Sequence, residues 1–298
     1  MPDLPKRPLG RTGLEVTVLG YGAMDLRGEP DSGPCTDAQA DRILNAVLDA
    51  GINFVDTARS YGISEERVGK AISHRRSEYY LATKVGGPHT AEDLVAKVQE
   101  SLKLLRTDYI DLIQLHSNPS RQELEEHGVL DTMRELQHQG KVRFIGISST
   151  NPNMKGQIEM GVFDEFQVPY SILRRDHEEL IAAAAATGAG IVLRGGAADG
   201  GPGKEEGPYW KAWSDARLDD LLGGMSRQEF ILRFTISNPA LSTTNVGTIN
   251  PSHLEENINS VLKGPLPPDI YAEAKRRTAE MEAVGSVGRL RRQNATGQ

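Results

Sequence analysis

Residues 79–116, YYLATKVGGPHTAEDLVAKVQESLKLLRTDYIDLIQLH, contain an apolar run, a segment with helical spacing and a second apolar run. The runs at 79–86 and 109–116 are short and bounded by turn or breaker residues, as buried strands are. Between them, Thr90 precedes two acidic residues, an arrangement that is typical of the start of a helix. The stretch therefore predicts a strand–helix–strand unit with parallel strands.

The same alternation of apolar runs and helical segments extends over nearly the whole chain. Helical segments are expected at 37–51, 90–106, 129–141 and 176–188. The apolar runs lie at 16–24, 52–58, 79–86, 109–116, 143–149, 165–171, 190–196 and 243–249. Eight such repeats without an intervening linker predict a single domain over 1–298, an α/β fold of the closed (β/α)8 TIM barrel type.

Both ends of the chain add to this barrel. Residues 7–18 predict an N-terminal β-hairpin that plugs the lower end of the barrel, because an Arg-Thr-Gly turn separates two extended pieces. The segment 267–284 begins with proline and has helical spacing, which predicts an extra C-terminal helix. The tail at 286–298 is expected either to be flexible or to fold over the barrel mouth.

Composition excludes several classes of protein. A net charge of −7 and 38% hydrophobic residues indicate a globular protein without the basic surface that nucleic acid requires. No apolar run approaches the ~18 residues of a membrane span, and the first residues lack the apolar core of a secretory signal. The lone Cys35 excludes an internal disulfide, so we expect a cytoplasmic protein.

Four ionisable residues stand at or just beyond successive strand ends: Asp56, Tyr61, Lys84 and His116. The carboxyl ends of the strands in such a barrel share one mouth, where catalytic groups gather. Three of them also have a purely structural interpretation. Asp56 can cap a helix or close a turn, Lys84 can form an ion pair on the rim, and His116 can be a buried imidazole.

Taken together, the four side chains suit proton exchange with an alcohol or alkoxide. The pKa of tyrosine is ordinarily about 10, too high for an efficient acid at neutral pH. A neighbouring Lys84 ammonium would favour the phenolate of Tyr61, and Asp56 would hold that lysine charged and oriented. A neutral His116 would then bond to the same substrate oxygen.

The chain resembles the aldo-keto reductases over almost its entire length, in LGYGAM, DTARSYG, ATKVG, LIQLH, IGIS and VGTINPSHLEEN. Asp56, Tyr61, Lys84 and His116 match the catalytic tetrad of that family, in the same order. The resemblance implies an NAD(P)H-dependent oxidoreductase that reduces an aldehyde or ketone, or catalyses the reverse reaction. The nicotinamide would supply the hydride and Tyr61 the proton.

The resemblance also implies contacts to the nicotinamide end of the cofactor. Ser148 and Gln167 stand where the family holds the carboxamide, and Ser149 replaces the more usual asparagine. Arg194 replaces an aromatic residue that stacks on the ring in many relatives, and a guanidinium can stack as well. Alternatively, Arg194 pairs with an acid on the rim.

At the adenosine end, the resemblance implies a phosphate-binding segment that leads into a helix starting near Asn250 or Pro251. Gly247 and His253 stand where many relatives carry basic residues for the 2′-phosphate. NADP(H) is therefore expected from the family, NAD(H) is allowed, and no metal is expected. The implied residues of this segment are Gly247, Thr248, Ile249, His253, Glu256 and Asn257.

Substrate contacts are expected from the loops at the mouth. Met24 and Asp25 follow the first strand, and Trp210 and Trp213 lie in the long segment after the seventh. Two indoles can close over a substrate or simply pack that segment onto the barrel. We expect a small carbonyl or alcohol substrate, whose identity the sequence does not give, and a monomer or small homo-oligomer.

Two other functions remain open at this stage. Lys84 at a strand end also suits an aldolase that forms a Schiff base with its substrate. A redox-sensing subunit, similar to the aldo-keto-reductase-like β subunits of potassium channels, would bind the cofactor with little turnover.

Overall fold

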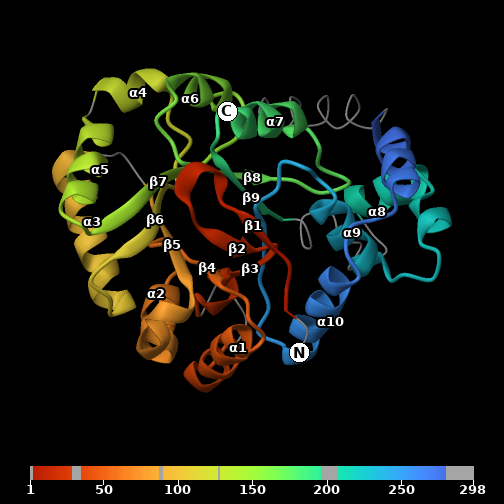
Figure 1. The fold of residues 1–298 in the computed structure, drawn as a ribbon, viewed down its shortest axis with the longest axis horizontal. Helices are drawn as coiled ribbons and strands as arrows, with labels where there is room; N and C mark the ends of the chain where they lie inside the picture. Colours follow the sequence, from red (N-terminus) through yellow and green to blue (C-terminus); the bar gives the residue numbers. More distant parts are fainter. Residues whose placement is uncertain (1–2, 29–34, 87–89, 127, 196–206, 280–298) are drawn as a thin grey trace, which may run out of the picture.

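The structure, a computed structural model, describes residues 3–28, 35–86, 90–126, 128–195 and 207–279. It is a closed barrel of eight parallel strands with helices around it (Figure 1). Around the barrel the order is β10-β3-β4-β5-β6-β7-β8-β9. The strands are β3 (Leu19–Gly22), β4 (Phe54–Asp56), β5 (Tyr80–Val85), β6 (Ile110–Leu115), β7 (Val142–Ser148), β8 (Glu165–Pro169), β9 (Gly190–Arg194) and β10 (Thr243–Val246). The predicted TIM barrel is confirmed.

The helices that surround the barrel include the four that the sequence predicts, namely α1, α3, α5 and α7. Side chains fix several helix starts: Thr36 forms a capping box with Gln39 before α1, and Thr90 and Ser226 accept backbone N–H bonds before α3 and α9. The helices are α1 (Asp37–Asp49), α2 (Ser64–Ile72), α3 (Ala91–Leu105), α4 (Arg121–Glu126), α5 (Val129–His138), α6 (Met154–Met160), α7 (Glu178–Ala186), α8 (Gly207–Asp215), α9 (Arg227–Ile236) and α10 (Pro251–Leu262).

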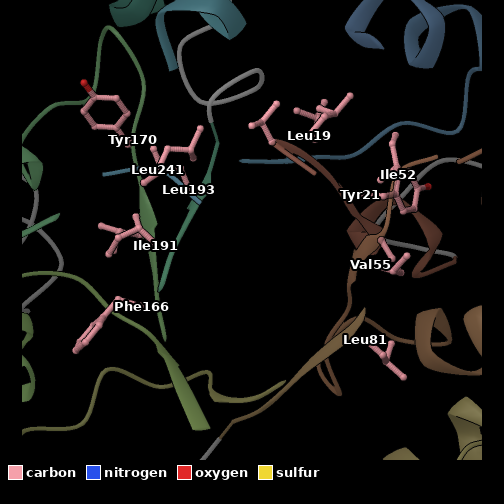
Figure 2. Close-up of a cluster of buried hydrophobic side chains, with 14 of the residues drawn as sticks. Leu19, Tyr21, Ile52, Val55, Leu81, Phe166, Tyr170, Ile191, Leu193 and Leu241 are labelled. Atoms are coloured by element: carbon pink, nitrogen blue, oxygen red, sulfur yellow. The ribbon is translucent and has the colours of Figure 1, made fainter. Parts of the chain in front are cut away.

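The main hydrophobic core lies between the strands and these helices. Alternate strand residues such as Leu19, Tyr21, Val55 and Leu81 project outward from the barrel (Figure 2) and are almost completely buried. Because side chains alternate along a strand, the residues between them must face the barrel interior.

A hairpin closes the lower end of the barrel, as the sequence predicts. Its strands are β1 (Lys6–Pro8) and β2 (Glu15–Thr17), and its short helix η1 (Gly10–Thr12) lies at the tip. Figure 1 shows the hairpin, in red, over the ring of strands. Three of its apolar side chains are fully or nearly fully buried and pack against inward-facing residues of four barrel strands. The hairpin contributes Leu9, Leu14 and Val16, and the barrel contributes Phe54, Ala82, Leu112 and Val192.

The first barrel strand is shorter than the predicted run at 16–24. Glu15–Thr17 pairs antiparallel with Lys6–Pro8 and completes the hairpin, and Leu19–Gly22 pairs in parallel with β4 and β10. One apolar run therefore supplies two strands that separate at Val18. The run predicted correctly that these residues are buried, but hydrophobicity alone does not mark the change of partner.

Above the plug, the barrel interior becomes polar. Phe54, Ala82 and Leu112 contact the hairpin, and two residues further along each strand stand Asp56, Lys84 and Gln114. The two-residue repeat of a strand gives each later residue the same inward direction, one layer closer to the mouth. The barrel thus carries these polar side chains on rigid strands instead of on loops.

The C-terminal region contains the expected extra helix, which covers residues 268–279 as far as the structure describes it. Its Tyr271 packs against Phe234 of α9, with ring centroids 4.9 Å apart. The predicted tail at 286–298 lies outside the described residues. None of the helices in the described ranges is both long and apolar enough to cross a membrane.

Candidate active site

A buried ion pair forms the centre of the site. Lys84 Nζ lies 2.5 Å from Asp56 Oδ2 and also donates to the Thr57 carbonyl at 2.9 Å. Lys84 has no exposed surface and Asp56 only 3%. Burial raises the pKa of Asp56, and the Lys84 ammonium opposes that rise. This pair holds the lysine in one orientation inside the barrel.

The second carboxylate oxygen of Asp56 is held by two amides. Gln167 Nε2 donates to Oδ1 at 3.2 Å and Gln114 Nε2 at 3.5 Å. Gln167 belongs to β8 and Gln114 to β6, so strands across the barrel interior converge on one carboxylate. Asp56 therefore acts as the anchor of the group, and its position fixes that of Lys84.

Tyr61 and His116 lie directly above this pair. Lys84 Nζ is 5.0 Å from the centroid of the Tyr61 ring, and the Tyr61 and His116 rings meet edge to face at 5.6 Å. Both side chains are partly exposed, in contrast to Lys84 and Asp56. The four residues that the sequence singled out are thus brought together, with the phenol and the imidazole on the open side.

The imidazole of His116 is held and kept neutral. Ser60 Oγ lies 3.1 Å from His116 Nδ1, which orients the ring and leaves Nε2 as its other polar atom. Burial, followed by the charges of Lys84 and Arg194, lowers the pKa of His116 to about 4. At neutral pH the ring can therefore offer a hydrogen bond without adding a third charge beside the ion pair.

This neutral histidine predicts a pH dependence of stability. The folded-state pKa lies below the ordinary value of 6.5, so the unfolded chain binds a proton first as the pH falls. The stability that His116 contributes is therefore complete above about pH 6.5 and is lost as the pH falls towards 4. The free energy of unfolding, measured with denaturant between pH 7 and 4, should fall more steeply for the wild type than for His116→Gln. Equal slopes would contradict a partly buried, neutral imidazole.

The residues expected at the nicotinamide end surround the same mouth. Ser148 ends β7, Gln167 lies on β8, and Arg194 ends β9, close enough for its charge to affect Asp56 and His116. Ser149 is fully buried and its hydroxyl donates to Gln157 Oε1. A contact from Ser149 to a ligand would therefore require this hydroxyl to leave Gln157.

The adenosine segment has the expected helix start. Asn250 caps α10 by accepting the Ser252 N–H, Pro251 stands in the first turn, and that turn carries no acidic residue. Gly247 and His253 are exposed. The Tyr21 hydroxyl donates a hydrogen bond to the Thr248 carbonyl at 2.9 Å. Ile249 is half-buried, Glu256 exposed and Asn257 buried.

The expected substrate residues divide into two groups. Met24 is 44% exposed on the short helix η2 (Ala23–Leu26), and Asp25 of the same helix lies beside Gly247. Trp213, in contrast, has no exposed surface, donates to Asp219 at 2.9 Å and packs edge to face on Phe230.

Trp210 also packs inward from α8. The guanidinium of Arg227 lies 4.2 Å from the centroid of its ring. Both indoles therefore join α8 to the segment of η4 (Leu218–Leu221) and α9, which is the packing alternative that the sequence left open. Residues 196–206 of the same connection lie outside the described residues.

Four residues near the site escaped the sequence analysis. Ser60 and Gln114 belong to the quoted motifs, and only the geometry shows that they contact His116 and Asp56. Ile63 is 43% exposed two positions after Tyr61, on a loop that packs beside Gly28. Glu165 lies buried on β8, two positions before Gln167. Apart from their neighbours in the chain, these residues carry no sequence signal.

Comparison with known proteins gives a consistent picture. The sequence profile of the Aldo/keto reductase family matches residues 18–209. The uncharacterised oxidoreductase YqkF of Bacillus subtilis (strain 168) is 29% identical over 286 residues, which cover 86% of this chain and 90% of that protein. L-galactose dehydrogenase of Arabidopsis thaliana is 28% identical over 293 residues, with 88% and 89% covered. An aldo-keto reductase from Bacillus halodurans, solved in its holo form, is 29% identical with a TM-score of 0.81, and the match covers 92% of this chain and 96% of that one.

The barrel and these relatives define an oxidoreductase enzyme built on a TIM barrel. The chain belongs to the aldo-keto reductase family.

Proposed function

We propose that the protein reduces the carbonyl group of a small aldehyde or ketone, or oxidises the corresponding alcohol, with Tyr61 as the proton donor or acceptor. The observation that carries this proposal is the buried Lys84–Asp56 pair beneath the Tyr61 ring. An ammonium with no exposed surface acts on the phenol through a medium of low dielectric, where charges interact strongly. The ammonium lies 5.0 Å from the centroid of the ring, where it would stabilise the negative charge that develops on the Tyr61 oxygen as the proton leaves.

The other two members of the tetrad have separate tasks in this proposal. Neutral His116 donates a hydrogen bond to the carbonyl oxygen and orients it towards the Tyr61 hydroxyl. Asp56 holds the Lys84 ammonium in place, and is itself held by the two amides. Positioned proton transfer of this kind usually contributes roughly 10²- to 10⁴-fold to the rate.

The described residues fit a nicotinamide dinucleotide. The exposed Gly247 stands next to the start of α10, whose positive dipole end suits a phosphate, and Gln167, Ser148 and Arg194 lie around the tetrad. These residues would hold the two ends of the cofactor, with Glu256 and Asn257 at the adenine. When bound, the cofactor supplies the hydride for the carbonyl carbon.

A Schiff-base function for Lys84 fits the geometry poorly. A lysine nucleophile must be neutral and reach a substrate carbonyl. Lys84 has no exposed surface and directs its ammonium to Asp56 and the Thr57 carbonyl. In the reductase proposal, Lys84 acts on Tyr61 from its observed position beside Asp56 and does not have to reach the substrate. The lone Cys35, which is buried and free, supports a reducing, cytoplasmic setting for this enzyme.

Measuring the binding of the coenzyme provides a direct test of this proposal. We propose NADP(H) as the preferred form, although His253 is the only basic side chain between residues 247 and 257. Fluorescence titration should show binding of NADPH, and of NADH less tightly. His253→Ala should weaken NADPH alone, by up to roughly tenfold for one charge-assisted bond.

Arg194→Ala serves as the matched comparison in that titration. Because Arg194 lies at the nicotinamide end, its loss should weaken both coenzymes by the same factor. If neither coenzyme bound at micromolar concentration, the proposed function would be wrong.

A further inference from the structure

Glu165 is a buried acid inside the barrel that the proposed reaction does not use. It lies on β8 with no exposed surface, and neither carboxylate oxygen has a hydrogen-bond partner among the described residues. It pairs in register with Gly146 of β7 and Gly190 of β9. A methyl group built on Gly146 would lie 2.1 Å from Glu165 Oε2, so the glycine provides the space that this side chain fills.

Gln114 borders the same space. The methyl group built on Gly146 would lie 3.2 Å from Gln114 Cγ as well as against Glu165. The amide nitrogen of Gln114 donates to Asp56 Oδ1, whereas its buried oxygen Oε1 has no donor within the described part of the chain. Within the described residues, an acceptor without a donor and an acid without a partner therefore both border Gly146, which pairs in register with each of them.

The protonation state of Glu165 decides whether the two groups complement each other. The charged groups that act on it are Asp56, Lys84 and Asp164. Lys84 is already engaged by Asp56, and the two aspartates repel a further negative charge. Burial, reinforced by Asp56, raises the pKa of Glu165 well above its usual range. Both effects favour the neutral form of the carboxyl, which carries an O–H donor.

We propose that Glu165 is a positioning residue, which as a neutral acid donates its O–H to Gln114 Oε1 and so fixes the amide that holds Asp56. The effect passes from Gln114 to Asp56, then to Lys84 and the Tyr61 ring. The bond from Gln114 to Asp56 is long at 3.5 Å, so its strength depends on how firmly the amide is held. The inference rests on the proposed reductase function for its kinetic consequences, but not for the state of Glu165 itself.

Two substitutions of similar size separate this role from packing. Glu165→Gln keeps a neutral side chain with an N–H donor, so its kcat should stay near that of the wild type. Glu165→Met fills the space without a donor and should lower kcat about tenfold, with KM and coenzyme affinity nearly unchanged. Its thermal stability should be equal or higher, because a buried polar group has been replaced by an apolar one.

Gln114 provides the test of the connection. Gln114→Met should lower kcat at least as much as Glu165→Met, and the double variant should be no slower than Gln114→Met alone, because both changes break one chain of contacts. Thr243→Val is the matched control, since its buried hydroxyl also lacks a partner within the described ranges and it belongs to β10, on the opposite side of the barrel from β6. It should leave kcat unchanged.

The protonation state of Glu165 can be measured independently of catalytic activity. An infrared difference spectrum of the wild type minus Glu165→Gln at pH 7 should contain the carbonyl stretch of a protonated carboxylic acid. The pH profiles of kcat should coincide for these two proteins on the basic side.

Three results would overturn the inference. They are a carboxylate signal at pH 7, a basic limb that moves to lower pH in Glu165→Gln, and a kcat equal to that of the wild type in Glu165→Met. An inactive wild type with the acid signal intact would instead count against the reductase proposal alone.

Discussion

Replacing Tyr61 by phenylalanine is expected to lower kcat for carbonyl reduction by roughly 10²- to 10⁴-fold. The substitution removes the only hydroxyl that the proposed reaction uses as an acid. It keeps the ring that packs edge to face on His116 and lies over Lys84. Steady-state kinetics with a panel of aldehydes and ketones would measure the loss.

The controls for this variant separate chemistry from folding. Coenzyme affinity and the thermal midpoint should remain close to those of the wild type, because Tyr61 is partly exposed and no ion pair is broken. Tyr109→Phe removes a phenol just before β6, at the end of the barrel opposite the mouth, and should leave kcat unchanged. A Tyr61→Phe enzyme with more than a tenth of wild-type kcat would rule out Tyr61 as the proton donor.

Much of the fold could be predicted from the sequence because the barrel repeats one physical pattern. Each unit contains a short run buried on both sides and a helix with one apolar stripe, so eight repeats suffice to indicate the barrel. The tetrad was equally visible, because Asp56, Lys84 and His116 each stand at a strand end, and parallel strands bring these ends to one mouth.

The parts that escaped prediction depend on register and on the direction of side chains. The run at 16–24 is mostly apolar, yet its first residues belong to the hairpin and its later ones to the barrel. The sequence left two roles for Trp213, contact with a substrate or packing of its segment onto the barrel, and only the structure shows its buried indole joining α8 to η4 and α9. In a strand that is buried on both sides, hydrophobicity does not show which face a residue takes.

The interior polar layer illustrates the same limit. Glu165 and Gln114 stand in apolar strands. The sequence alone does not show which residues lie beside their side chains in the folded protein. Only the register of β6, β7 and β8 shows that both border Gly146 and lie beneath Asp56. Their shared position makes them candidates for a role in the site.

Replacing Lys84 by methionine is expected to destabilise the protein by about 3–5 kcal/mol, as well as to abolish most of its activity. The Asp56 carboxylate would stay buried without its cation, and the two amides do not balance a full charge. In the variant, Asp56 would hold its proton to higher pH in the folded than in the unfolded state. The penalty should therefore be small at acidic pH and grow as the pH rises through the unfolded pKa of the aspartate.

A second substitution then separates the structural from the catalytic role of the pair. Asp56→Asn combined with Lys84→Met leaves a neutral amide beside an apolar chain, so the double variant should recover much of the lost stability. It should not recover activity, because no ammonium remains beside the Tyr61 ring. Chemical denaturation of both variants between pH 5 and 8, alongside their kcat, provides the measurement. If the double variant were as unstable as Lys84→Met, the loss would come from packing around the lysine chain and not from an uncompensated Asp56 charge.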